Sequence, residues 1–165
     1  MAPFDDHHPI PQPLDEIYAR LDKPVLMVSG TNTYISCSSV GIVSQWSAAT
    51  LNTHPGSYGW DSSTSTYTVP KSGIYKVTAH FQYTGASITD RGQAGLLYKD
   101  GVLWARSFRT FQNVASGTEY FPATVSAIAS CVGGSTTFQM RHAGLAGLSM
   151  YMLETRFMVE CIEVL

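Results

Sequence analysis

Hydrophobic and polar residues alternate along much of the chain after residue 24, with the two-residue period of a β-strand. The longest alternating run covers residues 74–83. One set of alternate positions holds Tyr75, Val77, Ala79, Phe81 and Tyr83, and the other holds Ile74, Lys76, Thr78, His80 and Gln82. We therefore expect one long strand here, with the aromatic set facing a core and His80 on the more polar face.

Shorter apolar runs predict the other strands. They cover residues 25–28, 40–46, 67–70, 95–98, 102–104, 125–132, 136–141 and 151–164. No long helical period follows residue 24. About ten strands separated by turn residues predict an all-β fold, a jelly-roll sandwich of antiparallel strands.

Two glycine-containing turns predict hairpins within this fold. Asp100-Gly101 lies between two apolar runs, and both positions tolerate the positive φ of a tight two-residue turn. Gly133-Gly134 lies between the next two runs in the same way. We expect each pair of runs to form neighbouring antiparallel strands.

Residues 1–24 differ from the rest and predict an extended N-terminal arm before a head of residues 25–165. Four of the eight prolines fall in the first thirteen residues, and proline at this density favours extended, unpaired backbone. Leu14, Ile17, Tyr18 and Leu21 then follow the i, i+3, i+4, i+7 spacing of one apolar stripe on two helical turns.

Two helical turns are too short to be stable alone in water, so this stripe has to dock on another surface. It docks either on its own domain or on neighbouring copies in an oligomer, or it tethers the chain to a different protein. Leu14, Ile17, Tyr18 and Leu21 are the candidate binding residues of the arm in each case.

Composition adds an indication about the surface. Apolar residues make up 44% of the 165 positions and charged residues only 13%, about half the share of roughly 25% in an average globular protein. Much of the surface is therefore Ser, Thr, Gly and Asn. Such a surface suits strands that face other subunits better than it suits a monomer that depends on charge for solubility.

Charge and hydropathy exclude two classes of partner. The net charge of −2 and the scattered Lys and Arg residues give no basis for nucleic-acid binding. No apolar run approaches the roughly 18 residues needed to span a bilayer. The N-terminus is acidic and lacks the basic and apolar segments of a signal peptide, so we expect no classical export signal.

Cys37, Cys131 and Cys161 are an odd number at irregular spacing. This pattern indicates neither a disulfide framework nor a metal site, and we expect buried, reduced thiols. An immunoglobulin fold is also excluded, because Cys37 and Cys131 lie too far apart for its disulfide.

The motifs of catalysis are missing from the sequence. Nucleophile elbows, zinc-binding His-Glu-x-x-His, phosphate-binding glycine loops and dinucleotide fingerprints do not occur. His54, His80 and His142 have no neighbouring carboxylate or cysteine at ligand spacing, and His7 and His8 lie in the proline-rich arm. Tyr58, Trp60 and Trp104 lie near loops and could stack on sugar rings, but core positions are the more frequent role. We expect no enzyme activity, no metal and no cofactor.

The order of several motifs resembles the globular head of the complement one-q and tumour-necrosis-factor superfamily. Residues 97–102 resemble its Leu-Tyr-Lys-Asn-Gly hairpin, and the aromatic-rich final strand is in place. An aromatic residue, a turn with proline and the Gly-x-Tyr-x-hydrophobic opening of a long strand also occur in the family's order. The residues of this run are Trp60, Tyr67, Pro70, Gly73, Tyr75 and Val77. Trp46 and Asn52 fill the family's upstream aromatic and Asn positions.

The resemblance covers residues 25–165, with departures. Gly133-Gly134 replaces the family's Gly-Asp pair, and no collagen-like stalk precedes the head. The family's calcium sites cannot be matched to a cluster of carboxylates in this sequence.

The resemblance implies a homotrimer, in which one sheet is apolar on both faces. Two aromatic-rich strands carry more aromatic side chains than one core face needs, so we predict that some of them lie in the contact between copies. The predicted trimer-interface residues are Tyr75, Phe81, Tyr83, Phe138, Tyr151 and Phe157.

Heads of this kind without a collagen stalk resemble jelly-roll modules on the virions of tailed bacteriophages. One expectation is a trimeric cement or decoration protein, made in the host cytoplasm, whose arm binds the major capsid protein or another virion protein. A second is the tip of a tail fibre or spike that binds host glycan or protein, and a third is a secreted recognition domain. The short arm favours the first, because a fibre tip normally follows a long shaft.

Overall fold

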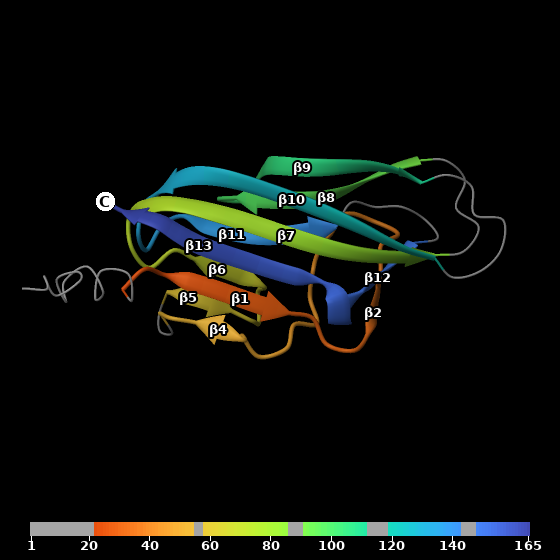
Figure 1. The fold of residues 1–165 in the computed structure, drawn as a ribbon, viewed down its shortest axis with the longest axis horizontal. Coiled ribbons are helices and arrows are strands. Elements are labelled where there is room, and N and C mark those ends of the chain that lie inside the picture. Colours follow the sequence, from red (N-terminus) through yellow and green to blue (C-terminus); the bar gives the residue numbers. More distant parts are fainter. Residues whose placement is uncertain (1–21, 55–57, 86–90, 112–118, 143–147) are drawn as a thin grey trace, which may run out of the picture.

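The computed structural model describes residues 22–54, 58–85, 91–111, 119–142 and 148–165, which form two antiparallel β-sheets packed face to face (Figure 1). The prediction of an all-β sandwich is confirmed, with thirteen strands, several of them only two or three residues long, in the described part. The helical structure described there is one 3₁₀ turn, η1 (Met152–Glu154). No helix among the described residues is long and apolar enough to cross a membrane.

The larger sheet is built around one long strand, β7. An edge strand pairs with β7 on one side, and a row of strands that ends in short ones follows on the other side. The strands of this sheet are β10 (Glu119–Cys131), β7 (Gly73–Gly85), β13 (Arg156–Val164), β1 (Val25–Ser29) and β4 (Leu51–Asn52), with β12 (Leu148–Tyr151) and β2 (Tyr34–Ser36) continuing beside the far half of β7.

The smaller sheet covers the other side of the core. Its central strand β11 pairs with β8 along one edge and with two short strands along the other. The strands of this sheet are β5 (Gly59–Asp61), β6 (Thr66–Thr68), β3 (Gly41–Ile42), β11 (Thr137–His142), β8 (Arg91–Lys99) and β9 (Val102–Phe111).

The alternation predicted for residues 74–83 is present in β7. The aromatic set faces inward and is fully buried, whereas Lys76 is exposed and His80 is half-buried on the opposite face. Inward residues of β11 and β13 close the core from both sheets, among them Phe138 and Phe157. These aromatic residues therefore fill the space between the two layers.

The last strand was predicted as one segment, residues 151–164, and this prediction is wrong. The 3₁₀ turn η1 divides it into β12 and β13, and β7 changes partner from β13 to β12 at the same point. Thr155 fills the break: its buried hydroxyl donates to the Tyr151 carbonyl at 2.9 Å and accepts from the Gln82 amide at 3.4 Å. The buried positions are even-numbered before the turn (Leu148, Met150) and odd-numbered after it (Phe157, Val159), so the turn shifts the alternation by one residue.

The Asp100-Gly101 hairpin is confirmed between β8 and β9. Both residues have positive φ, 53° and 76° respectively. Asp100 also ties the turn to β11, because its carboxylate accepts the Thr137 amide at 2.8 Å while its own amide donates to the Thr137 carbonyl at 3.0 Å.

The second predicted hairpin is wrong, because β10 and β11 belong to different sheets. The Gly133-Gly134 turn carries the chain across the end of the sandwich. A Cβ atom on Gly133 would lie 2.9 Å from the Lys71 backbone, and the Gly133 amide donates to the Ser72 hydroxyl at 3.1 Å. The glycines permit a close crossing, and the strands they join do not pair.

The strand predicted over residues 40–46 is largely absent. β3 keeps only two of these residues, and Trp46 forms an isolated bridge with Gly30. Gln45 has a φ of 66°, and the Trp46 indole N–H donates to the Val43 carbonyl at 2.9 Å. This local turn folds the Trp46 ring back against the core and interrupts the strand.

The three cysteines are buried and free, as the sequence predicted. Burial raises the pKa of Cys37 to about 12, so this thiol stays protonated at neutral pH.

Candidate interaction surfaces

The strand β10 forms a long edge of the larger sheet, because β7 is its one partner among the described strands. Residues 120–131 of this strand contain no charged side chain. Tyr120 and Ile128 expose 52% and 61% of their surface. Monomeric proteins commonly protect a long edge with charges, prolines or a short strand, and residues 120–131 carry one proline, Pro122, and no charge.

The outer face of the larger sheet is dominated by hydroxyl, amide and apolar groups. Those that β7 and β10 direct outward are Ile74, Lys76, Thr78, His80, Gln82, Thr84, Tyr120, Pro122, Thr124, Ser126, Ile128 and Ser130. Lys76 is the single side chain of this set with a full charge at neutral pH, and Arg156 and Glu160 follow on β13.

Side chains of β7 and β10 form hydrogen bonds with one another on this face. The hydroxyls of Thr78 and Ser126 lie 2.9 Å apart, and His80 Nδ1 lies 2.9 Å from the Thr124 hydroxyl. Burial and the nearby Arg156 lower the pKa of His80, which keeps the imidazole neutral at physiological pH. The paired side chains of β7 and β10 are therefore neutral, and the nearest charges on the face are Lys76, Arg156 and Glu160.

Three tyrosines gather at one end of the same face, and we call them the tyrosine cluster: Tyr34, Tyr120 and Tyr151. The rings of Tyr34 and Tyr151 stack with centroids 4.9 Å apart, and Tyr120 lies 6.0 Å from Tyr151. A hydrogen bond with Tyr120 raises the pKa of Tyr34. The cluster joins strands β2, β12 and β10, and it adds aromatic surface to the uncharged face.

The base of the N-terminal arm is fixed to the head by polar contacts. The Asp22 carboxylate pairs with Lys71 and lies 3.5 Å from His54 Nε2. The hydrogen bond from Lys71 lowers the pKa of Asp22. Lys23 donates to the Ile162 carbonyl, and the Pro24 carbonyl accepts the Cys161 amide at 2.8 Å. The arm thus starts beside the end of β13.

The predicted arm residues Leu14, Ile17, Tyr18 and Leu21 lie outside the described residues.

The six predicted trimer-interface residues divide into two groups. Five have no accessible surface within a single chain: Tyr75, Phe81, Tyr83, Phe138 and Phe157. They fill the core and have no surface to offer another copy, so we correct their placement. Only Tyr151 of the six keeps exposed surface, and it belongs to the tyrosine cluster.

The outer-face residues that sequence reasoning missed are mostly small and polar. Thr78, Thr124 and Ser126 looked like ordinary solvent-facing positions. The signal that could have found them is the charge-free run of β10, which is unusual for an edge strand.

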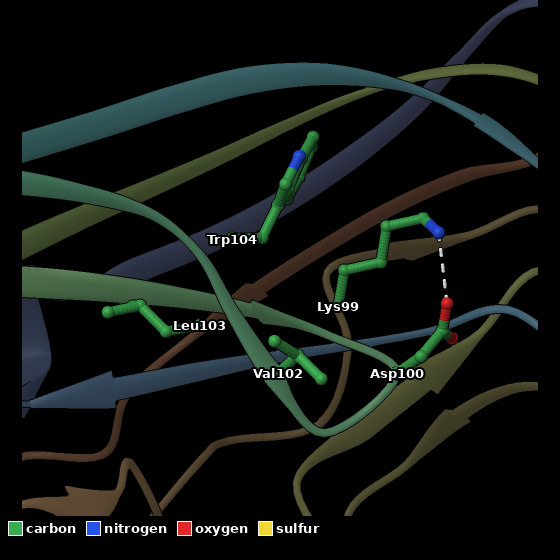
Figure 2. Close-up of a pocket in the computed structure, with 5 residues that line it drawn as sticks. All are labelled: Lys99, Asp100, Val102, Leu103 and Trp104. Atoms are coloured by element: carbon green, nitrogen blue, oxygen red, sulfur yellow. Dashed lines mark hydrogen bonds and ion pairs between the residues drawn. The ribbon is translucent and has the colours of Figure 1, made fainter.

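A surface pocket lies beside the β8–β9 hairpin, with a volume of about 310 Å³ (Figure 2). Its lining residues are Lys99, Asp100, Val102, Leu103 and Trp104. Lys99 pairs with Asp100 at 2.9 Å, and Val102 and Leu103 are largely exposed. The pocket is therefore an apolar hollow bordered by one ion pair.

The loop aromatics differ in their burial. Trp104 packs on Phe138 with ring centroids 5.5 Å apart, and Trp60 lies 5.9 Å from Phe157. Both support the core, whereas half of the Tyr58 surface is exposed. Within the described ranges, no group of three or more His, Cys, Asp or Glu side chains is placed to hold a metal ion.

No protein-family model matches the chain, and no curated protein sequence matches it either.

Proposed function

We propose that this chain is a non-enzymatic structural protein that assembles with copies of itself into a homotrimer. The observation that carries the proposal is the edge strand β10, whose residues 120–131 are uncharged and whose outward side chains continue the outer face of its sheet. Packing against another copy would cover this edge and remove the exposed Tyr120 and Ile128 from water.

A ring of three copies suits this surface. Contact between β10 of one copy and the sheet face of the next uses two different surfaces, and such head-to-tail contacts form closed rings when the rotation closes. The resemblance to complement one-q and tumour-necrosis-factor heads favours three copies. The hydroxyl residues on the face are small, so the backbones of two copies can approach closely. They also lose little side-chain entropy when they are buried.

Within the same proposal, the trimer is a cement or decoration protein of a tailed phage virion. The arm of residues 1–24 would bind the capsid shell, since a proline-rich segment can order along a neighbouring surface as it binds. The polar anchor at Asp22 supports this role, because it transmits a pull on the arm directly to Lys71 of the head.

The assembly and the arm can be tested with the full chain and a chain that lacks residues 1–22. Light scattering after size-exclusion chromatography should give about three times the 18.0 kDa chain mass for the full chain. The shortened chain should remain a folded trimer and lose co-sedimentation with capsids assembled without the protein. A monomeric full chain would contradict the trimer, and unchanged co-sedimentation would contradict the role of the arm.

The hairpin pocket favours one alternative function, the receptor-binding tip of a tail fibre or spike. A pocket of about 310 Å³ with exposed Leu103 and a neighbouring tryptophan is a hollow that a glycan or a peptide side chain could enter. Adsorption of the isolated protein to host cells, lost in Leu103→Glu and kept in Ser44→Glu, would favour this function over the capsid role.

A further inference from the structure

Exposed apolar side chains gather at the end of the sandwich where the arm begins. We call this group the arm-end patch: Tyr58, Val132, Ile162, Val164 and Leu165, each with 42–71% of its surface exposed. Figure 1 shows the end of β13, marked C, and the start of β1 at the same end of the molecule.

Short contacts hold the members of the patch around Lys71 and Ser72. The Leu165 amide donates to the Ser72 carbonyl at 3.1 Å, and Val164 pairs with Gly73. Val132 precedes the Gly133 turn that crosses Lys71 and Ser72, and the Tyr58 ring lies against Gly134. These contacts bring segments distant in sequence together at one end of the sandwich.

The chain enters this patch directly from the arm. Asp22 pairs with Lys71, and Lys23 donates to the carbonyl of Ile162, which is itself a patch residue. The preceding residue, Leu21, is the last member of the apolar stripe. The last stripe residue, Leu21, therefore lies one residue before Asp22, which is fixed at the patch.

The stripe is short enough to stay near the patch. Leu14 lies eight residues before Asp22, which is about 12 Å of helix and at most about 28 Å of extended chain. Either span keeps the stripe close to Lys71. The stripe also has a polar side formed by Asp15, Glu16 and Arg20, which can face solvent while the apolar side is covered.

We propose that the apolar stripe of residues 14–21 covers the arm-end patch of its own head. Docking would give a two-turn segment the tertiary contacts that it needs to be stable. It would also leave residues 1–13, with their four prolines, as the part of the arm that reaches beyond the head. This proposal is independent of the trimer, and with the proposed capsid role it would leave residues 1–13 to bind the shell.

Disulfide trapping in the full chain tests this proposal. The variant pair Ile17→Cys with Val132→Cys places one thiol on the stripe and one on the patch. The matched control is Ile17→Cys with Val40→Cys, because Val40 is 56% exposed and precedes β3, which pairs with the opposite end of β11. The three native thiols are buried and free, so they should not compete with the introduced pairs.

Under mild oxidation, the stripe–patch pair should form a disulfide within one chain at least ten times faster than the control pair. Equal rates would overturn the proposal, and so would a disulfide that joins two chains, because the occupant would then be a second copy. Amide hydrogen exchange gives a second measurement. Residues 14–21 should exchange at least ten times more slowly than the free peptide, and this protection should fall in Val132→Asp; exchange at the rate of the free peptide would also overturn the proposal.

Discussion

At the scale of single residues, Asp61 shows how one carboxylate organises a surface turn. Its Oδ1 accepts the Ser63 amide at 2.8 Å and the Ser63 hydroxyl at 2.7 Å, and its Oδ2 accepts the Thr64 hydroxyl at 2.8 Å. These bonds favour the charged form and lower the pKa of Asp61 to about 2. The turn between β5 and β6 is therefore linked to the ionisation of this group.

The linkage predicts how this turn responds to acid. The folded-state pKa lies below the value of about 3.9 for an unfolded chain, so the stabilisation is complete above that value and is lost as the pH falls through about 2. Carbon-detected NMR titration of the Asp61 carboxyl should show the low pKa. In Ser63→Ala/Thr64→Ala the pKa should rise toward the unfolded value, while Asp100 keeps its own; an unchanged Asp61 would contradict this explanation.

At the scale of secondary-structure elements, β8 and β7 pack closely at a glycine. Gly95 faces Phe81 across the sandwich, and a Cβ atom on this glycine would lie 2.3 Å from the Phe81 ring. Phe81 is fully buried and stacks on Tyr83 with ring centroids 5.8 Å apart. The absent side chain thus sets the distance between the two sheets at this point.

Gly95→Ala should lower the free energy of unfolding by about 1–3 kcal/mol, the usual cost of inserting a methyl group into a filled core. Urea unfolding followed by tryptophan fluorescence measures this change. Combining it with Phe81→Leu, which shortens the ring that the methyl would strike, should cost less than the sum of the single changes. Strict additivity would show that the two residues do not compete for the same space.

The elements also show what the sequence could predict and what it could not. β7 and the Asp100-Gly101 hairpin depend on local alternation and on φ at two neighbouring residues, so they are visible in the sequence. The Gly133-Gly134 turn is equally visible as a turn, but its residues do not encode which sheet the next strand joins. That choice depends on the crossing over Lys71 and Ser72, which are distant in sequence.

At the scale of the whole molecule, aromatic residues misled the prediction of the interface. Rings such as Tyr75 and Phe157 are needed to fill the space between two sheets, so their number did not mark a second apolar face. The proposed contact surface instead consists of Thr, Ser and Tyr side chains on β7, β10 and β12. Small polar residues resemble solvent-facing positions in a sequence, and only the sheet order places them together on one uncharged edge.

A charge introduced in the middle of this face should separate the copies. Ser126→Arg would bury an unpaired cation in every contact, at a cost of several kcal/mol, whereas in the single chain the position is exposed and the change should cost little. Light scattering should then report one chain in place of three. Ser44→Arg, exposed outside this sheet, is the matched control and should keep the trimer; a trimeric Ser126→Arg protein would contradict the assignment of the face.

The central position of β13 also has a consequence for how the protein is made. This strand follows every other described strand in sequence, yet it pairs with β7 on one side and with β1 on the other. A ribosome therefore releases β1 and β7 long before the strand that joins them, and pairing between such distant segments is slow. Until β13 emerges, its two partners each lack a neighbouring strand, so we expect the nascent chain to need protection from aggregation during that interval.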